Sequence, residues 1–247
     1  MKIDLNCDVG EGYGNDAELM GIVTSANIAC GYHAGDDLTM KVTVESAIEN
    51  GVGIGAHPGY PDREGFGRRV KDISMTELFE IITDQIVTLQ QITSTVGGRL
   101  RHVKPHGALY NQAAKDRFMA ETIAAAVKAV DEDLILFGPS GSELVEAGSS
   151  AGLRTAAEAF ADRTYMPDGS LTSRSEPNAL IYDIDKSVSQ IMGIITNGDV
   201  TAIDGATIPL NADTICIHGD GENAVAFARA IRDSLKKNKV EIVSIGN

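Results

Sequence analysis

Short apolar runs typical of β-strands alternate with longer amphipathic segments from one end of the chain to the other. Strands repeat every two residues and helices every 3.6, so the pattern predicts the two kinds of element in turn. Predicted strands span residues 3–9, 25–30, 52–57, 101–106, 134–138, 154–161, 214–218 and 240–245. Predicted helices span residues 16–23, 36–49, 75–95, 116–130, 141–148, 186–196 and 222–237. This alternation favours an α/β fold with a parallel sheet, either a closed (β/α) barrel or an open doubly wound sheet.

The helix after Ser74 has the clearest signals. Ser74 and Glu77 have the spacing of a capping box, and Gly97-Gly98 would end the helix. Its apolar stripe consists of Leu78, Ile81, Ile82, Ile86 and Leu89. One face of this helix is therefore expected to pack on the sheet.

One stretch interrupts the rhythm of strand and helix. Residues 163–213 contain a polar loop, a helix and a predicted hairpin around Asp204-Gly205. We interpret this stretch as an insertion within one domain that spans residues 1–247, because a large α/β domain is routine at this length.

Polar residues occupy one face of several predicted strands. Asp4, Asn6 and Asp8 alternate with apolar residues in the first strand, and Lys104 and His106 share a face in the fourth. Burying so many polar groups is unfavourable unless they pair with one another. The pattern indicates an apolar face under helices and a polar face toward a barrel interior.

Four of the five histidines follow an apolar run: His33, His57, His106 and His218. They therefore fall at or just after the carboxyl ends of strands, where parallel α/β folds build their active sites. Glu158 and Asp162 add carboxylates near the end of the sixth strand. A single histidine there is often only a packing residue, but four on one rim favour a functional site.

The loop of residues 55–69, GAHPGYPDREGFGRR, carries Arg63, Arg68 and Arg69 in an otherwise acidic chain. These guanidinium groups would suit a carboxylate or phosphoryl group. Alternatively, the arginines pair with Asp62 and Glu64 in a solvated loop.

The overall charge excludes some partners. The chain carries 21 Lys and Arg against 35 Asp and Glu, a formal charge of −14. We expect neither nucleic acid nor an anionic membrane surface as a partner, because phosphate contacts require clustered cations. The sequence shows no export signal and no apolar run of membrane-spanning length, and its three cysteines read as buried free thiols. A cytoplasmic location is the simplest expectation.

Known phosphate-binding and nucleophile motifs are missing from the sequence. The segment GPSGSEL at 138–144 lacks the lysine and the spacing of a phosphate loop. There is also no serine elbow and no cysteine pair suited to a nucleophile or a zinc knuckle.

Six ordered blocks of the sequence resemble one family along almost the whole chain. They are DLNCDVGEGYG (4–14), ANIACGYHAGD (26–36), GAHPGYPDREGFGRR (55–69), VKPHGALYN (103–111), FADRTYMPDGSLTSR (160–174) and ICIHGD (215–220). The family is LamB/YcsF, the A subunits of 5-oxoprolinase. The resemblance implies an irregular seven-stranded parallel (β/α) barrel of the glycoside hydrolase/deacetylase type. It also implies ATP-dependent opening of 5-oxoproline (pyroglutamate) to L-glutamate, together with two other subunits.

That chemistry suits the residues already identified. A lactam is a poor electrophile, and phosphorylation of its oxygen would activate the carbonyl before water attacks. Because no ATP loop is recognisable here, we expect the partners to use ATP and Mg²⁺, with ring opening on this chain and no tightly bound cofactor in it.

Residue roles follow from this assignment. We expect Asp8 to activate or orient water, His57 and His106 to act as acid–base or oxyanion-stabilising groups, and Lys104 to counter developing charge. The full predicted catalytic set is Asp8, His57, Lys104, His106, Glu158, Asp162, His218 and Asp220, and the predicted substrate-binding set is Asn6, His33, Arg63, Arg68 and Arg163.

Two other functions stay open on the sequence. A metal-dependent, deacetylase-type amide hydrolase could use Asp8 with two of His33, His57, His106 and His218 as ligands. A protein that binds a carboxylated ligand, or stabilises a complex, is the non-enzymatic alternative.

Overall fold

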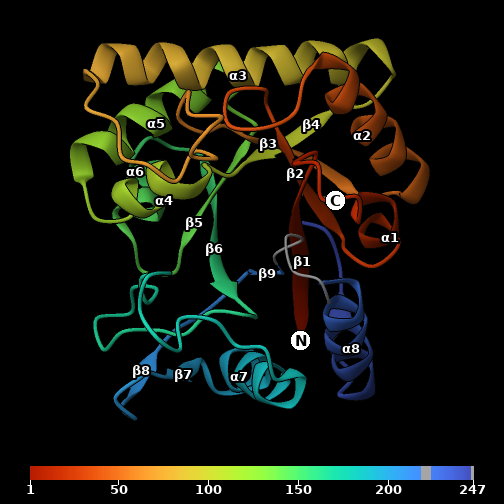
Figure 1. Cartoon of the computed structure of the whole chain (residues 1–247), viewed down its shortest axis with the longest axis vertical. Helices are drawn as coiled ribbons and strands as arrows, with labels where there is room; N and C mark the ends of the chain where they lie inside the picture. The colour runs from red at the N-terminus through yellow and green to blue at the C-terminus, as the bar shows by residue number, and fades with distance from the viewer. Residues whose placement is uncertain (218–223, 246–247) are drawn as a thin grey trace.

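The computed structural model describes residues 1–217 and 224–245, and in these ranges seven parallel strands close into a barrel (Figure 1). The barrel strands are β1 (Lys2–Val9), β2 (Ser25–Ala29), β3 (Gly53–His57), β4 (Leu100–Val103), β5 (Ile135–Pro139), β6 (Arg154–Phe160) and β9 (Thr214–Cys216). Strand β9 pairs with β6 on one side and with β1 on the other, which closes the sheet. Of the two arrangements that the sequence predicted, the structure therefore has the closed barrel and not the open doubly wound sheet.

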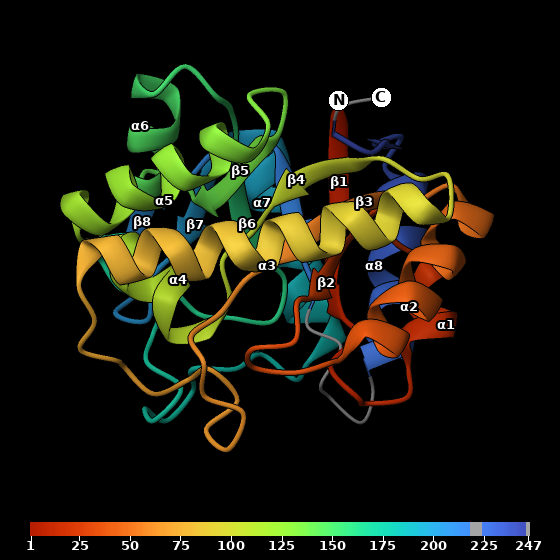
Figure 2. The same ribbon diagram turned by 90° about the horizontal axis from the view of Figure 1, so that it is seen from above.

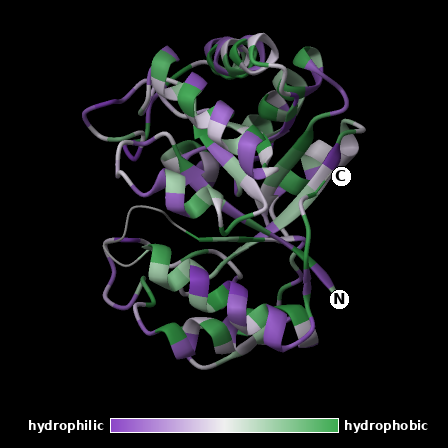
Figure 3. Cartoon of the chain, turned by 90° about the vertical axis from the view of Figure 1, so that its right-hand side faces the viewer, coloured by the Kyte–Doolittle hydropathy of each residue, from purple (hydrophilic) through white to green (hydrophobic). Residues whose placement is uncertain are grey.

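Helices lie around the outside of the barrel (Figures 1 and 2). They are α1 (Asp16–Met20), α2 (Asp37–Asn50), α3 (Met75–Thr95), α4 (Gly107–Ala113), α5 (Arg117–Val130), α6 (Glu143–Ser150), α7 (Ile184–Asn197) and α8 (Ala224–Lys237). Figure 3 shows hydrophobic and hydrophilic residues on different faces of these helices. Each helix buries its apolar face toward the barrel or a neighbouring helix, as a layered α/β fold requires.

The longest helix, α3, forms as its sequence predicts. The Ser74 hydroxyl accepts a hydrogen bond from the backbone N–H of Glu77, which satisfies one of the free donors of the first turn. Leu78, Ile82 and Ile86 are fully buried. The helix therefore covers one side of the barrel along its whole apolar stripe.

The polar face of β1 points into the barrel, as the alternation predicts. Asn6 bonds to Glu158 and Thr214 across the interior, while Leu5 and Cys7 are fully buried in the outer core. Hydrogen bonds between strands far apart in sequence thus satisfy the inward polar groups.

Two predicted strands are markedly shorter in the structure. The fourth strand ends at Val103, and His106 becomes the N-cap residue of helix α4, which the sequence analysis did not predict. Helix α4 has seven residues and begins at a glycine, so it lacks the length and the capping signal that identify helices in a sequence. The last predicted strand shrinks to β10 (Glu241–Ile242), which pairs with the start of β1 and is not one of the seven barrel strands.

The chain between β6 and β9 contains α7 and an antiparallel hairpin of β7 (Asp199–Thr201) and β8 (Thr207–Pro209). The hairpin turns around Asp204-Gly205, as predicted. Cys7, Cys30 and Cys216 are buried free thiols. Among the described helices, none has the length and apolar character needed to cross a membrane.

Candidate active site

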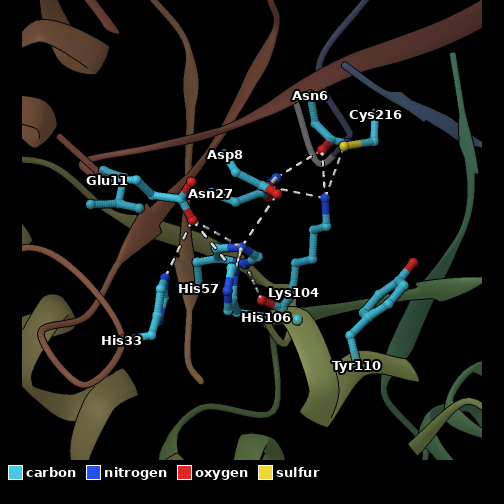
Figure 4. A network of polar contacts seen from close by, with 12 residues as sticks. Asn6, Asp8, Glu11, Asn27, His33, His57, Lys104, His106, Tyr110 and Cys216 are labelled. Carbon is cyan, nitrogen blue, oxygen red and sulfur yellow. Dashed lines mark hydrogen bonds and ion pairs between the residues drawn. The ribbon is translucent and has the colours of Figure 1, made fainter. Parts of the chain in front are cut away.

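A buried network of polar side chains fills the carboxyl-end half of the barrel (Figure 4). Asn27 on β2 donates hydrogen bonds to the side-chain oxygens of Asn6 (2.7 Å) and Asp8 (2.8 Å) on β1. His102 Nε2 lies 2.8 Å from Asn27 Oδ1, and Tyr110 on α4 donates to Glu158 on β6. The network therefore connects five structural elements through side chains alone.

Lys104 is the buried cation of this network. Its Nζ lies 3.0 Å from Asp8 Oδ1, 3.0 Å from Glu158 Oε1 and 3.1 Å from Cys216 Sγ. Burial acts to lower the pKa of Lys104, but the charges around it, Asp8 above all, raise that pKa well above its usual value. The ammonium is thus held charged between two carboxylates.

A second cluster lies beside the first and contains Glu11, His33, His57 and His106 (Figure 4). His57 Nε2 lies 2.9 Å from His106 Nδ1 and 3.4 Å from Asp8 Oδ2. Glu11 Oε1 lies 3.3 Å from His33 Nε2 and 3.4 Å from His106 Nδ1. The two clusters therefore meet at Asp8 and His57.

Backbone carbonyls fix the outer nitrogens of two of these imidazoles. His57 Nδ1 lies 2.7 Å from the carbonyl oxygen of Lys104, and His106 Nε2 lies 2.9 Å from that of Phe66. A carbonyl oxygen only accepts hydrogen bonds, so both outer nitrogens carry the proton. The rings are thereby oriented with their other nitrogens toward each other.

Burial and neighbouring charge separate the pKa values of the histidines. Burial, and next the charge of His57, lowers the pKa of His33 to about 3, and burial with Lys104 lowers the pKa of His102 to about 3. Burial also acts to lower the pKa of His57, but the charge and hydrogen bond of Asp8 raise it above its usual value overall. Neighbouring imidazoles thus differ in their tendency to hold a proton, as acid–base pairs require.

A cavity of about 720 Å³ opens onto both clusters. Asp8, His57, Lys104 and His106 line its inner part. The exposed Arg68, Lys115 and Arg174 and the buried Arg163 also line it, along with residues 170–173. The volume lies in the range of small-molecule sites, and the cations would favour an anionic ligand.

The structure separates the predicted site residues into groups. Asp8, His57, Lys104, His106, Arg68 and Arg163 line the cavity, whereas Asn6 and Glu158 lie behind them in the network and His33 stacks on His106. Asp162 is half-buried just after β6 and is not itself among the described residues that line the cavity, although Phe160 and Arg163 are. His218 and Asp220 fall outside the described residues.

Two predicted substrate-binding arginines donate to backbone carbonyls. Arg63 Nη1 donates to the carbonyl oxygens of Gly31 and Gly35 and is not among the described residues that line the cavity, so its role in substrate binding stays a prediction. Arg163 is buried and donates to the carbonyls of Thr172 and Ala179, which holds the segment after β6 in place while one side of the arginine faces the cavity. Arg69, in turn, pairs with Asp62, as the solvated-loop alternative predicts.

Sequence reasoning missed several residues of the site: Glu11, Asn27, Tyr110 and Cys216. Glu11 lies two residues after the end of β1, within one of the sequence blocks that resemble the family. Its position just after a strand end could therefore have identified it as a site residue. Tyr110 had no such signal, because helix α4 was not predicted.

The fold and the site together define a class: a closed parallel (β/α) barrel with a buried acid–base network at the carboxyl ends of its strands. A match to the LamB/YcsF family over residues 3–247 narrows this class, and the chain belongs to that family. It is 50% identical over 246 residues to the A subunit of the Tolumonas auensis 5-oxoprolinase, covering 98% of each chain.

Solved structures agree with this placement. The lactam utilization protein from Thermus thermophilus superposes with a TM-score of 0.93 at 42% identity, covering 99% of this chain and 100% of that one. A family 4 carbohydrate esterase from Streptomyces lividans has a TM-score of 0.50 at 13% identity, covering 99% of this chain and 93% of the esterase. The second likeness concerns the barrel fold alone.

Proposed function

We propose that this chain is the A subunit of an ATP-dependent 5-oxoprolinase and carries the ring-opening site of the complex. The observation that supports this most strongly is 50% identity to a relative named as the A subunit of 5-oxoprolinase, over nearly the full length of both chains. A site lined by carboxylates, imidazoles and a buried lysine is what hydrolysis of an amide needs.

The residues have distinct proposed roles in ring opening. Asp8 orients or deprotonates the attacking water, since one of its carboxylate oxygens is held by Lys104 and Asn27 and the other lies toward His57. His57 and His106 move the proton toward the ring nitrogen that leaves. Lys104, held by Glu158, balances the negative charge that develops around the attacked carbon.

Substrate binding would use the arginines that line the cavity. We propose that Arg68, and the face of Arg163 that lines the cavity, attract the carboxylate of 5-oxoproline. The activation of the lactam by ATP and Mg²⁺ is assigned to two partner subunits, because residues 138–144 do not form a phosphate loop.

The test is a reconstituted complex of this chain with its two candidate partner subunits, assayed for glutamate and phosphate together. Asp8→Asn should reduce glutamate formation by at least about a hundredfold, the usual contribution of one acid–base group. Asp133→Asn is the matched control, because Asp133 is exposed and pairs with Arg99 away from the cavity. Full glutamate formation by a complex that lacks this chain, or that carries Asp8→Asn, would contradict the proposal.

A further inference from the structure

Two ring nitrogens of the imidazole cluster, His57 Nε2 and His106 Nδ1, face each other across 2.9 Å. The outer nitrogens of His57 and His106 donate to the carbonyls of Lys104 and Phe66. A neutral imidazole carries only one N–H, so when both rings are neutral both inner nitrogens present lone pairs. Two lone pairs at this distance repel unless a cation lies between them, and that cation is either a proton or a metal ion.

A carboxylate oxygen completes this arrangement on one side. Glu11 Oε1 lies 3.4 Å from His106 Nδ1 and 3.9 Å from His57 Nε2. For bonds of about 2.1 Å, two ligand atoms lie ~3.0 Å apart at a right angle and ~3.4 Å apart at a tetrahedral angle. The three observed separations span these values, so small side-chain rotations would suffice for all three atoms to reach one ion.

His33 is close but is not suited to be a fourth ligand. Its ring is stacked on that of His106, with centroids 3.8 Å apart and planes 4° from parallel, so an ion in the plane of one ring lies out of the plane of the other. Its Nε2 faces the Glu11 carboxylate, an acceptor, and therefore carries the proton of the neutral ring. His33 thus orients Glu11 from behind, as residues around metal ligands commonly do.

The cavity distinguishes the three donors from His33. Glu11, His57 and His106 all line the cavity, whereas His33 is not part of its described lining. From this geometry we propose that Glu11, His57 and His106 form a site for one divalent transition-metal ion of the Zn²⁺ class, with its remaining positions open to the cavity.

The donor set determines the kind of ion. Two imidazoles and one carboxylate suit Zn²⁺, Mn²⁺, Co²⁺ or Fe²⁺, whereas Mg²⁺ and Ca²⁺ prefer oxygen ligands alone. Open positions would admit a water molecule or an amide oxygen, and the ion would acidify the water or polarise the amide. With the ion bound, His57 and His106 would act as ligands, so the proton transfer proposed for them above belongs to the metal-free form. The sequence analysis considered a metal with Asp8 as the carboxylate ligand. The structure favours Glu11 in that place because one Glu11 oxygen lies within 3.9 Å of both inner nitrogens, whereas Asp8 Oδ1 is held by Lys104 and Asn27 and its Oδ2 lies toward His57.

The test measures metal binding without turnover, so its result is independent of the proposed oxoprolinase function. The full-length chain, without an affinity tag, is dialysed against EDTA and titrated with Zn²⁺ by calorimetry and with Co²⁺ by visible absorption. We expect one equivalent to bind, with the d–d bands of Co²⁺ in a nitrogen and oxygen environment. Glu11→Gln and His106→Gln should each weaken binding by at least about tenfold.

Glu18→Gln is the matched control, since Glu18 is an exposed carboxylate on α1 that pairs with Arg229. It should bind the metal as the wild type does. Circular dichroism would establish that each variant is folded. If His106→Gln does not fold, the comparison of Glu11→Gln with the wild type decides the test. The proposal would be overturned if the wild type did not bind the metal stoichiometrically, or if a folded Glu11→Gln variant bound it with unchanged affinity. The cation between His57 and His106 would then be a shared proton.

Discussion

At the scale of single residues, most buried charged side chains in the barrel interior lie beside a side chain of opposite charge. Asp4 is an exception. Its carboxylate lies in the barrel interior and accepts hydrogen bonds from the hydroxyls of Thr24, Ser25 and Thr214. Burial raises the pKa of Asp4 to about 6, although these three hydrogen bonds oppose the shift. Hydroxyl groups alone therefore do not replace the water that the ionised carboxylate loses.

This pKa makes stability depend on pH in a defined direction. The folded chain binds the Asp4 proton more tightly than the unfolded chain does, whose carboxyl has a pKa of about 3.9. The resulting stabilisation, on the order of 3 kcal/mol, is fully present below pH ~4 and is lost as the pH rises through about 6.

Asp4→Asn, which cannot ionise, should therefore gain stability relative to the wild type as the pH rises from 4 to 7. Urea unfolding across this range measures the difference, with the exposed Asp133→Asn as the control. Parallel stability curves for wild type and Asp4→Asn would show that Asp4 does not titrate with a raised pKa.

At the scale of elements, the loop between β3 and α3 folds over the histidine cluster and meets the start of α4. The carbonyl of Phe66 accepts from His106, and the carbonyl of Gly67 accepts from the backbone N–H of Ala108. Gly67 has φ +61°, and a Cβ added there would lie 2.8 Å from His106 Cδ2 and 3.0 Å from His33 Cβ. The loop can approach the imidazole rings this closely only because residue 67 has no side chain.

Gly67→Ala should therefore destabilise the chain more than Gly97→Ala does. Both glycines have positive φ, but a Cβ at Gly97 would meet nothing within 4 Å. Backbone strain alone should lower the free energy of unfolding by ~1 kcal/mol at Gly97, and contact with the histidine rings should add at least about as much at Gly67. Urea unfolding compares the two variants, and equal losses would mean that the rings move aside at little cost.

At the scale of the whole molecule, the scaffold and the chemistry occupy separate parts of the chain. Helices such as α3 and α5 pack outside the barrel and carry none of the cavity's polar network, whereas strand ends and the loops after them supply it. The segment from Ser170 to Arg174, which lies between β6 and β9, extends the cavity outward. A rigid barrel thus positions a site built mostly from strand ends and loops, the usual division in such folds.

The isolated chain should be catalytically silent. Lactam hydrolysis needs a large reduction in barrier, each ~1.4 kcal/mol being tenfold in rate. Acid–base groups typically contribute about 10²–10⁴-fold, which is too little without activation of the carbonyl. We expect the purified chain neither to hydrolyse ATP nor to open 5-oxoproline.

Adding the two partner subunits should produce glutamate and phosphate in equal amounts. A paired assay of both products, with and without partners, measures this. Robust ATP-dependent glutamate formation by the chain alone would place an ATP site in it and contradict the assignment of activation to the partners.

The sequence by itself determined the features that depend on local geometry. Period-two alternation placed Asp4, Asn6 and Asp8 on the inner face of β1, and the capping residue Ser74 marked the start of α3. The positions of His57 and His106 after apolar runs were enough to bring them to one rim, because parallel strands end at the same edge. Strand alternation, helix capping and strand ends depend on residues only a few positions apart, so they can be predicted from the sequence.

Tertiary structure alone decided which side chains meet. Lys104 finds Asp8 across 96 residues and Asn6 finds Glu158 across 152, contacts that exist only because β9 closes the barrel between β6 and β1. The loops that follow the neighbouring strands β1 to β4 likewise bring Arg63 to backbone carbonyls and Glu11 beside the histidines. A side chain's partners depend on where distant segments cross, and hydrophobic periodicity carries no information about that crossing.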